Sequence, residues 1–394
     1  MASRNRVIYQ SEGLYISEDA GSTLQADHEQ IERVQSANYS YTINRQDVNQ
    51  YGELARIDSI VLEPPTVSVD FTYLLTDGFN ERCLGFFVQH TGGGAGSQRN
   101  ATTAPNLPGN FASGHMVAHS GQNIFIVTGP DGEDLNEQGA LVDTNTDAAR
   151  DTVIGIGNCY ISDYSIDLSV GALPTASVTM EGANVRSSIT GKSFQSPAID
   201  QEDGSSVGHP IVALPDPATR QGCGTVIDRT ALVSLLPGEI PIGITTISGE
   251  TTAELVGDEG AHIQSCNISI PLSRSPLERL GSKFPFARSV DFPVNVTMSV
   301  SAIVNQTDAS NLVDVLDSGA QTISVRLKST NADTVMTDAM RFELKGAKLE
   351  SESYSSSIGS NKTVDLVFNA QVAGPNDTDN GLFVSGANAH PIYQ

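Results

Sequence analysis

The chain is dominated by segments in which apolar and small polar residues alternate. In SANYSYTI, residues 36–43, every second residue is Ser, Asn or Thr, and the others are Ala, Tyr or Ile. Because successive side chains of a strand point to opposite faces, this alternation predicts a strand with one apolar and one polar face. Strands are expected at 34–43, 66–75, 158–170, 174–182, 263–272, 294–303, 348–358 and 363–371, with further ones at 122–128 and 321–327. The pattern predicts an all-β fold with minor helix.

The alternating segments form two similar sets, which indicates an internal duplication. VQSANYSYTINRQDVNQYG (34–52) aligns with IQSCNISIPLSRSPLERLG (263–281) at an offset of 229 residues, which is 263 minus 34. Two later blocks align as well, 120–127 with 318–325 at an offset of 198 and 160–182 with 348–370 at an offset of 188. Because the blocks also keep their order along the chain, we expect two copies of one domain.

The duplication sets the expected domain boundaries. Copy 1 is assigned to residues 1–193 and copy 2 to residues 225–394. Between them, residues 194–224 are rich in Pro, Gly and acidic residues, which is typical of a linker. Copy 1 carries a Gly-, Ser- and Asn-rich loop at about 91–114 that copy 2 lacks. The first strand of copy 2 is expected to start near Val226, but the opening segment 6–17 finds no clean counterpart there.

Helical structure is expected only in short pieces. The segments RQDVNQYGEL (45–54) and SPLERLG (275–281) are each followed by a residue or segment that breaks a helix, so each is predicted to form a short helix. Further helical turns are expected at 79–87 and at 308–316, the second with Asp308 or Ser310 as its cap.

The charge balance argues against a general affinity for nucleic acid. The chain contains 22 Lys and Arg against 46 Asp and Glu, for a formal net charge of −24. Electrostatic binding to nucleic acid depends on Lys and Arg that neutralise phosphates, and this chain is poor in both. A solvated acidic surface and an acidic surface with a function both remain compatible with this balance.

From the amino terminus and the hydropathy we expect a protein made and kept in a cytoplasm-like compartment, unless it is exported by other means. The opening MASRNRVIYQSEG lacks the apolar core of a signal peptide. No apolar run approaches the roughly 20 residues that span a bilayer. The four cysteines have no CxxC spacing, and Cys159 and Cys266 fall on apolar strand faces, which favours buried thiols over disulfides or metal ligands.

No arrangement of residues predicts catalysis, so we expect neither an enzyme nor a cofactor. His115 and His119 have the spacing of a metal-binding pair, but no Glu partner and no helical periodicity accompany them. The acidic segment 130–137 departs from the spacing of a calcium loop. The glycines of TGGGAGS are not followed by the Lys-Ser/Thr of a phosphate-binding loop. No metal site is predicted.

The polar faces of the expected strands carry no Lys or Arg. Small hydroxyls, amides and some carboxylates recur in both copies instead. Sheets that face open solvent usually mix charges of both signs, which support solubility and protect edges. The exclusion of Lys and Arg favours a polar face that looks at something other than open solvent. The alternative is a Ser- and Thr-rich surface like those of many secreted sandwiches.

On these residues the chain resembles bacteriophage tail tube (major tail) proteins. The segments that carry the resemblance are VQSANYSYTINRQDVNQYG, LEPPTVSVDFTYLL and YISDYSIDLSVGALPTASVTMEG in copy 1, and IQSCNISIPLSRSPLERLG, FPVNVTMSVSAIV and SYSSSIGSNKTVDLVFN in copy 2. They cover about half of the chain.

The resemblance implies an architecture. Each copy would be a tail-tube-like β-sandwich or barrel domain that gives two β-hairpins to a ring-shaped inner barrel. Six domains form a ring, and stacked rings conduct double-stranded DNA. In some long-tailed phages two tube domains are fused, so that three chains close a pseudo-hexameric ring, and the duplication fits this version.

The resemblance also implies partners and sites. The chain would self-assemble as homotrimeric rings stacked head-to-tail in a virion tail, built in the host cytoplasm, and would meet tail terminator, distal tail and tape-measure proteins. DNA would pass without specific binding, and no membrane would be involved. The residues expected to face the lumen are Ser36, Asn38, Ser40, Thr42, Ser68, Asp70, Thr72, Ser165, Asp167, Ser177, Thr179, Ser265, Asn267, Ser269, Thr297, Ser299, Ser353, Ser355, Thr363 and Asp365.

Contacts between rings are expected from the inserted loop, with Gly92, Gly93, Gly94 and Asn106 as candidates, and from the N-terminal arm 1–30. The alternative function is another β-structural protein of a virion or cell surface, such as a capsid decoration or a fibre or adhesin module. A polysaccharide-acting enzyme is a third and more distant alternative.

Overall fold

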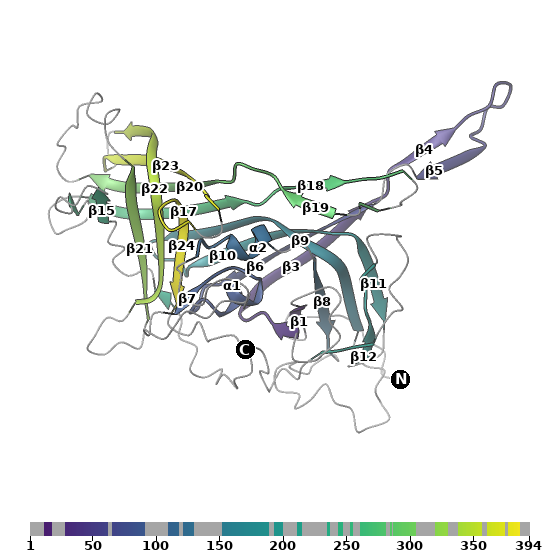
Figure 1. Ribbon diagram of the computed structural model, residues 1–394, viewed down its shortest axis with the longest axis horizontal. Coiled ribbons are helices and arrows are strands. Elements are labelled where there is room, and N and C mark those ends of the chain that lie inside the picture. Colours follow the sequence, from purple (N-terminus) through teal and green to yellow (C-terminus); the bar gives the residue numbers. More distant parts are fainter. Residues whose placement is uncertain are drawn as a thin grey trace.

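The computed structural model is built almost entirely of β-strands (Figure 1). It describes residues 12–17, 28–61, 65–90, 109–117, 121–129, 152–188, 193–199, 211–214, 235–236, 243–246, 253–254, 261–280, 284–285, 287–304, 320–329, 338–356, 361–374 and 377–386. In these ranges the helices are α1 (Phe79–Cys83) and α2 (Ser113–Val117), of five residues each. Among the described residues, no helix has the length and apolar character needed to cross a membrane. The predicted class, all-β with minor helix, is confirmed.

Eight strands form a continuous antiparallel sheet, which we call the inner sheet. Their order is β3–β6–β10–β9–β17–β20–β23–β22. The bounds are β3 Val34–Thr42, β6 Thr66–Leu74, β10 Thr175–Gly182, β9 Thr152–Ser169, β17 Ala261–Pro271, β20 Asn295–Val304, β23 Thr363–Gln371 and β22 Asp338–Ser355. The first four strands belong to copy 1 and the last four to copy 2, so the predicted hairpin strands are confirmed.

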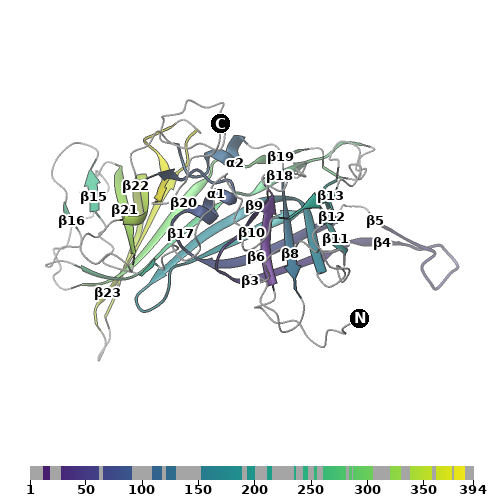
Figure 2. The same cartoon turned by 90° about the horizontal axis from the view of Figure 1, so that it is seen from below.

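Shorter strands complete an outer layer on each copy. In copy 1 they are β1 (Glu12–Ser17), β2 (His28–Gln30), β8 (Gln122–Thr128) and β11 (Asn184–Ser188). In copy 2 they are β14 (Leu235–Leu236), β15 (Gly243–Thr246), β16 (Ala253–Glu254), β21 (Gln321–Ser329) and β24 (Gly381–Gly386). The 18-residue strands β9 and β22 each belong to both layers. Figure 2 shows β8 and β11 running across the direction of β3, β6 and β10. The core fills the space between the layers.

The strand registers of the first half of the chain recur in the second half. Ser36 lies opposite Thr72 in copy 1, and Ser265 lies opposite Ser301 in copy 2, which keeps the offset of 229. Both strand pairs carry a register shift just before this position. The pairing of β10 with β9 recurs in β23 with β22 at the offset of 188, and it again includes the register shift. The two copies therefore share their irregularities as well as their pattern.

One block of the sequence alignment was wrong by one residue. Gln122 pairs with Cys159 in copy 1, and Gln321 pairs with Ala347 in copy 2, so the offset in this block is 199 (321 minus 122) rather than 198. In β8 every residue is buried, so the face alternation that fixes register elsewhere is missing from this strand.

The opening strand of copy 1, for which the sequence showed no clean counterpart, has an equivalent strand in copy 2. Ile16 of β1 lies opposite Ile124 of β8, and Ile244 of β15 lies opposite Ile323 of β21. The expected start near Val226 falls outside the described residues.

Two of the predicted helices are β-hairpins instead. In place of a helix at 45–54, β4 (Arg45–Val48) pairs with β5 (Asp58–Val61). In place of a helix at 275–281, β18 (Arg274–Leu277) pairs with β19 (Ala287–Val290). Each first strand follows closely on an inner strand, so cross-strand hydrogen bonding overrides a weak helical pattern. We call these hairpins arm 1 (45–61) and arm 2 (274–290).

The other helix predictions have different outcomes. The turn expected at 79–87 is confirmed as α1. The turn expected at 308–316 lies outside the described residues.

Part of the expected linker packs on copy 1. Strand β12 (Ser193–Gln195) pairs with β13 (Ile211–Ala213). Phe194 and Val212 are fully buried in a small cluster with Tyr15 and Phe125. The chain therefore adds a two-stranded element to the outer layer of copy 1 before it reaches copy 2.

A buried carboxyl group lies inside copy 1. Helix α1 places Glu81 in the core, where its Oε1 accepts hydrogen bonds from the hydroxyls of Tyr73 (2.8 Å) and Tyr164 (3.1 Å). Burial raises the pKa of Glu81 from 4.5 to about 7, although the two hydrogen bonds act in the opposite direction and the charge of Asp77 adds to the increase. The folded chain thus favours the protonated carboxyl.

We expect Glu81→Gln to remove part of the pH dependence of stability. The folded state holds its proton to higher pH than the unfolded state, so this group makes the free energy of unfolding fall as pH rises from 4.5 to about 7. The free energy of unfolding of the variant, measured relative to that of the unmodified chain, should be higher at pH 8 than at pH 4 by up to about 3 kcal/mol. Denaturant unfolding of unassembled chain at both pH values measures this. Glu53→Gln, on exposed arm 1, should leave the dependence unchanged, and equal pH dependence in Glu81→Gln and the unmodified chain would contradict the assignment.

Candidate functional site

The inner sheet has one continuous polar face. A lateral row of directly opposed residues crosses all eight strands in the order Ser36, Thr72, Ser177, Ser165, Ser269, Thr297, Asn369 and Lys348. Opposed residues of antiparallel strands project to the same side of a sheet. Across the row the hydroxyls of Ser36 and Thr72 are hydrogen-bonded at 2.7 Å.

All the residues expected to face a lumen belong to this polar face, and all of them are exposed or half-buried. Asp70, Asp167 and Asp365 make the face acidic at several points. The half-buried carboxyl of Asp163 also lies on it, and burial raises the pKa of that group. Lys348, at the end of the row, is a basic residue that the sequence prediction did not place there.

The inner sheet ends in two edges that correspond to each other. Among the described residues, β3 pairs only with β6, and the end of β22 after residue 349 pairs only with β23. In the middle of the sheet, β9 pairs with β17, and these strands are the equivalents of β22 and β3. One chain thus contains one junction between its two copies. The strands at the two free edges, β3 and β22, are the equivalents of the two strands that pair at this junction, β17 and β9.

Side-chain burial differs sharply between the junction and the free edges. At the junction, Ile268, Ile270 and Leu272 of copy 2 are each 0% exposed. Their equivalents at the free edge, Tyr39, Tyr41 and Ile43, are 38%, 56% and 41% exposed. On the other edge Tyr354 is 47% exposed, whereas its equivalent Ile166 is 0% exposed. The free edges therefore expose apolar residues at positions that the junction buries.

Arm 2 folds back on copy 1 near the junction. The guanidinium of Arg274 donates a hydrogen bond to the backbone carbonyl of His115 at 2.7 Å and lies 5.0 Å from the ring centre of Tyr160. Arg288 lies over the same ring at 5.8 Å and forms an ion pair with Glu181 at 3.2 Å. Burial lowers the pKa of Arg274. Arm 1 projects away from the body instead, as Figure 1 shows for β4 and β5.

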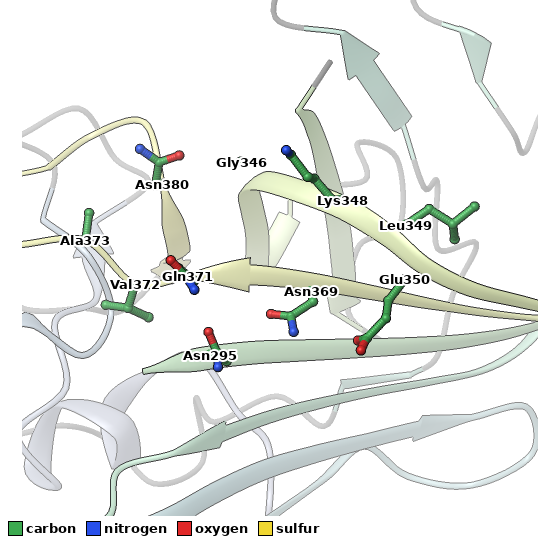
Figure 3. Close-up of a pocket in the computed structure, with 10 residues that line it drawn as sticks. All are labelled: Asn295, Gly346, Lys348, Leu349, Glu350, Asn369, Gln371, Val372, Ala373 and Asn380. Carbon is green, nitrogen blue, oxygen red and sulfur yellow. The ribbon is translucent and has the colours of Figure 1, made fainter. Parts of the chain in front are cut away.

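A pocket of about 790 Å³ lies on copy 2. It is lined by Asn295, Gly346, Lys348, Leu349, Glu350, Asn369, Gln371, Val372, Ala373 and Asn380. Figure 3 shows Glu350 and the amide side chains of Asn295, Asn369 and Gln371 gathered over β20, β22 and β23. The lining combines four amide side chains, three apolar side chains and a glycine with one acid and one base.

The residues predicted for ring-to-ring contacts, Gly92, Gly93, Gly94 and Asn106, lie outside the described residues, as does most of the inserted loop. The described ends of the loop tie the two copies together. Strand β7 (Gln89–His90) pairs in parallel with β24, and the backbone amide of Phe111 donates to the carbonyl of Leu382 at 2.7 Å.

The described residues that were considered for metal or thiol chemistry pack against other side chains or lie buried in the core. His115 lies in α2 with its ring 4.6 Å from that of Phe86, and His119 is outside the described residues. Cys159 and Cys266 are buried free thiols, as predicted, and burial raises the pKa of each to about 12. In the part of the chain that the structure describes, no three His, Cys, Asp or Glu side chains cluster in a way that could hold a metal ion.

Sequence reasoning found the polar face but missed the two arms and the pocket. The sequence signal for arm 1 lay in its apolar residues Tyr51 and Leu54, which the structure places at the exposed tip of the arm.

No protein-family model matches this chain, and no curated protein matches its sequence.

Proposed function

We propose that this chain is a structural subunit of a bacteriophage tail tube, in which three chains close a pseudo-hexameric ring around a lumen that conducts double-stranded DNA. The observation that carries the proposal is the burial of Ile268, Ile270 and Leu272 at the junction against the exposure of their equivalents at the free edge. Pairing of β22 in one chain with β3 in the next would repeat the junction and cover Tyr39, Tyr41 and Ile43.

The geometry of such a ring is suited to DNA. Three chains with eight inner strands each give 24 strands. At ~4.8 Å between strands and ~40° of tilt, the barrel is roughly 48 Å across at the backbone. Side chains on both walls leave a lumen about 40 Å wide. This width admits a DNA duplex, whose grooves are only about 8 Å deep. Closure also pairs both exposed edges, which otherwise invite aggregation.

The chemistry of the polar face supports passage without binding. Serine, threonine and asparagine offer no positive charge to phosphate, and Asp70, Asp167 and Asp365 repel it. A protein holds DNA by neutralising phosphates and releasing their counterions, so a face that is poor in Lys and Arg lets the duplex slide.

The arm tips suit contacts along the tube. Tyr51 of arm 1 and its equivalent Leu280 of arm 2 are both fully exposed, and an exposed large apolar residue at the same place in both copies favours a protein contact. Head-to-tail contacts of this heterologous kind do not close and therefore build filaments.

A disulfide between chains tests the ring. The junction pairs Ser269 with Ser165, so the proposed contact pairs Ser40 with Ser353 of the next chain. We expect Ser40→Cys/Ser353→Cys to form a ladder of covalent dimers and trimers under mild oxidation, and electron microscopy to show hollow stacked rings. In Ser40→Cys/Glu352→Cys the second thiol is on the opposite face, so this control should form far less disulfide.

Two results would contradict the proposal. One is equal cross-linking in both cysteine pairs. The other is the absence of rings, with discrete monomers or trimers only, which would favour a decoration or fibre protein.

A further inference from the structure

Arm 2 shows how an arm seats on the copy beside it. Three contacts fix arm 2 and the segment just before it on copy 1: the backbone amide of Leu272 donates to the carbonyl of Ser162 at 2.8 Å, Arg274 covers the ring of Tyr160, and Arg288 pairs with Glu181. These contacts bury Tyr160 to 5% exposure.

The same three positions exist on copy 2, and they line the pocket. The offset of 188 carries Tyr160 to Lys348, Ser162 to Glu350, and Glu181 to Asn369. Each of these three equivalents is a lining residue (Figure 3). The surface that arm 2 covers on copy 1 therefore corresponds to a pocket on copy 2.

Arm 1 is the equivalent of arm 2. The pairings Arg45 with Val61 and Arg274 with Val290 keep the offset of 229 in both strands. Arg45 is thus the counterpart of Arg274, but it is exposed, whereas Arg274 is half-buried.

We infer that the pocket on copy 2 is the docking site for arm 1 of the neighbouring chain, with Arg45 held by Glu350. The inference rests on the proposed ring and adds a second contact to the β3–β22 pairing. The occupant is a second copy of this chain, because only the arm that follows β3 arrives beside β22 when the junction is repeated.

The charges of the two surfaces are complementary. Arg45 and Asp47 lie two residues apart on the same side of β4, and Asp47 is already paired with Arg56 of the same arm at 2.8 Å. Arg45 is therefore the base that this side of β4 offers, and Glu350 is the acid in the lining of a pocket that also contains Lys348. On copy 1, where the position of Lys348 is the neutral Tyr160, arm 2 brings two arginines.

The arm contact also has a structural reason. Ile43 is 41% exposed, whereas the backbone amide of its equivalent Leu272 donates a hydrogen bond to the carbonyl of Ser162. The corresponding bond from the amide of Ile43 to the carbonyl of Glu350 in the next chain would fix the base of arm 1 directly beside the pocket.

A charge-reversal cycle on the full-length chain tests the docking. We expect Arg45→Glu alone and Glu350→Arg alone to raise the dissociation constant of the trimer by at least about tenfold, because each leaves like charges in contact. The double variant should return to within about threefold of the unmodified chain, since it restores an opposite-charge pair. Gln46→Glu, on the other side of β4, is the matched control and should have little effect. Arg45, Gln46 and Glu350 are exposed, so all variants should fold.

The Ser40→Cys/Ser353→Cys cross-link, introduced into each charge variant, separates the two proposals. If the cross-link forms and both single reversals leave the trimer as stable as before, arm 1 does not dock in the pocket, and the ring proposal survives. If no cross-link forms even in the unmodified background, the ring itself is wrong. Equal weakening by Gln46→Glu and Arg45→Glu would also overturn the specific contact.

Discussion

The variant Tyr354→Asp is expected to abolish ring formation while leaving the single chain folded. Tyr354 is 47% exposed in the chain, but in the ring it would lie opposite Tyr39, as Ile166 lies opposite Ile268 at the junction. A carboxylate at this buried, apolar position costs several kcal/mol, on the order of 3, at each of three interfaces. Sedimentation of the assembled material and electron microscopy measure the loss.

The adjacent residue supplies the control for this prediction. Ser353→Asp adds the same charge one residue earlier, on the polar face that already contains Asp365 opposite it. Rings should still form in this variant, although with a moderate loss from the two neighbouring carboxylates. Tyr354→Phe should assemble normally, because it keeps the aromatic contact. Intact rings in Tyr354→Asp would show that this edge is not an interface between chains.

Lysines on the polar face are expected to stop DNA passage without stopping assembly. Ser40, Ser68 and Ser269 are exposed or half-buried on that face, so long side chains fit there. Their replacement by Lys in three chains adds about nine positive charges per ring, and stacked rings multiply the attraction to phosphate. We expect virions with tails of normal appearance and a loss of infectivity of at least about a hundredfold.

Salt and a neutral substitution separate charge from bulk in this experiment. Ejection from the lysine variant should recover as salt rises, because counterion release weakens with ionic strength. Gln at the same three positions has similar length without charge and should preserve infectivity. Normal infectivity in the lysine variant would contradict the assignment of this face to the lumen.

Much of the fold could be predicted from period-two patterns. Strands such as β3 and β6 alternate cleanly, so the sequence predicted their bounds within one or two residues and separated their faces. The prediction of register failed where this alternation of faces is absent. In β8 every residue is buried, and there the alignment of the copies slipped by one residue.

The arms illustrate a different limit. Residues 45–54 have apolar residues at spacings that suit a short helix, but their backbone continues from an inner strand and pairs with 58–61. The hydrogen-bond partner that decides between helix and hairpin lies about ten residues away, so a local pattern does not contain it. The pocket was invisible for the same reason, since its lining comes from β20, β22, β23 and the turns beside them.

The sequence alone determined the two faces of the inner strands, the absence of Lys and Arg from most of the polar face, and the duplication. These properties repeat every second residue or recur at a fixed offset, so they are readable without coordinates. Only the tertiary structure decided that β9 pairs with β17, that β3 and the end of β22 remain as equivalent edges, and that arm 2 covers Tyr160. The order of strands depends on contacts between distant segments, and no local pattern specifies which edge is left without a neighbour.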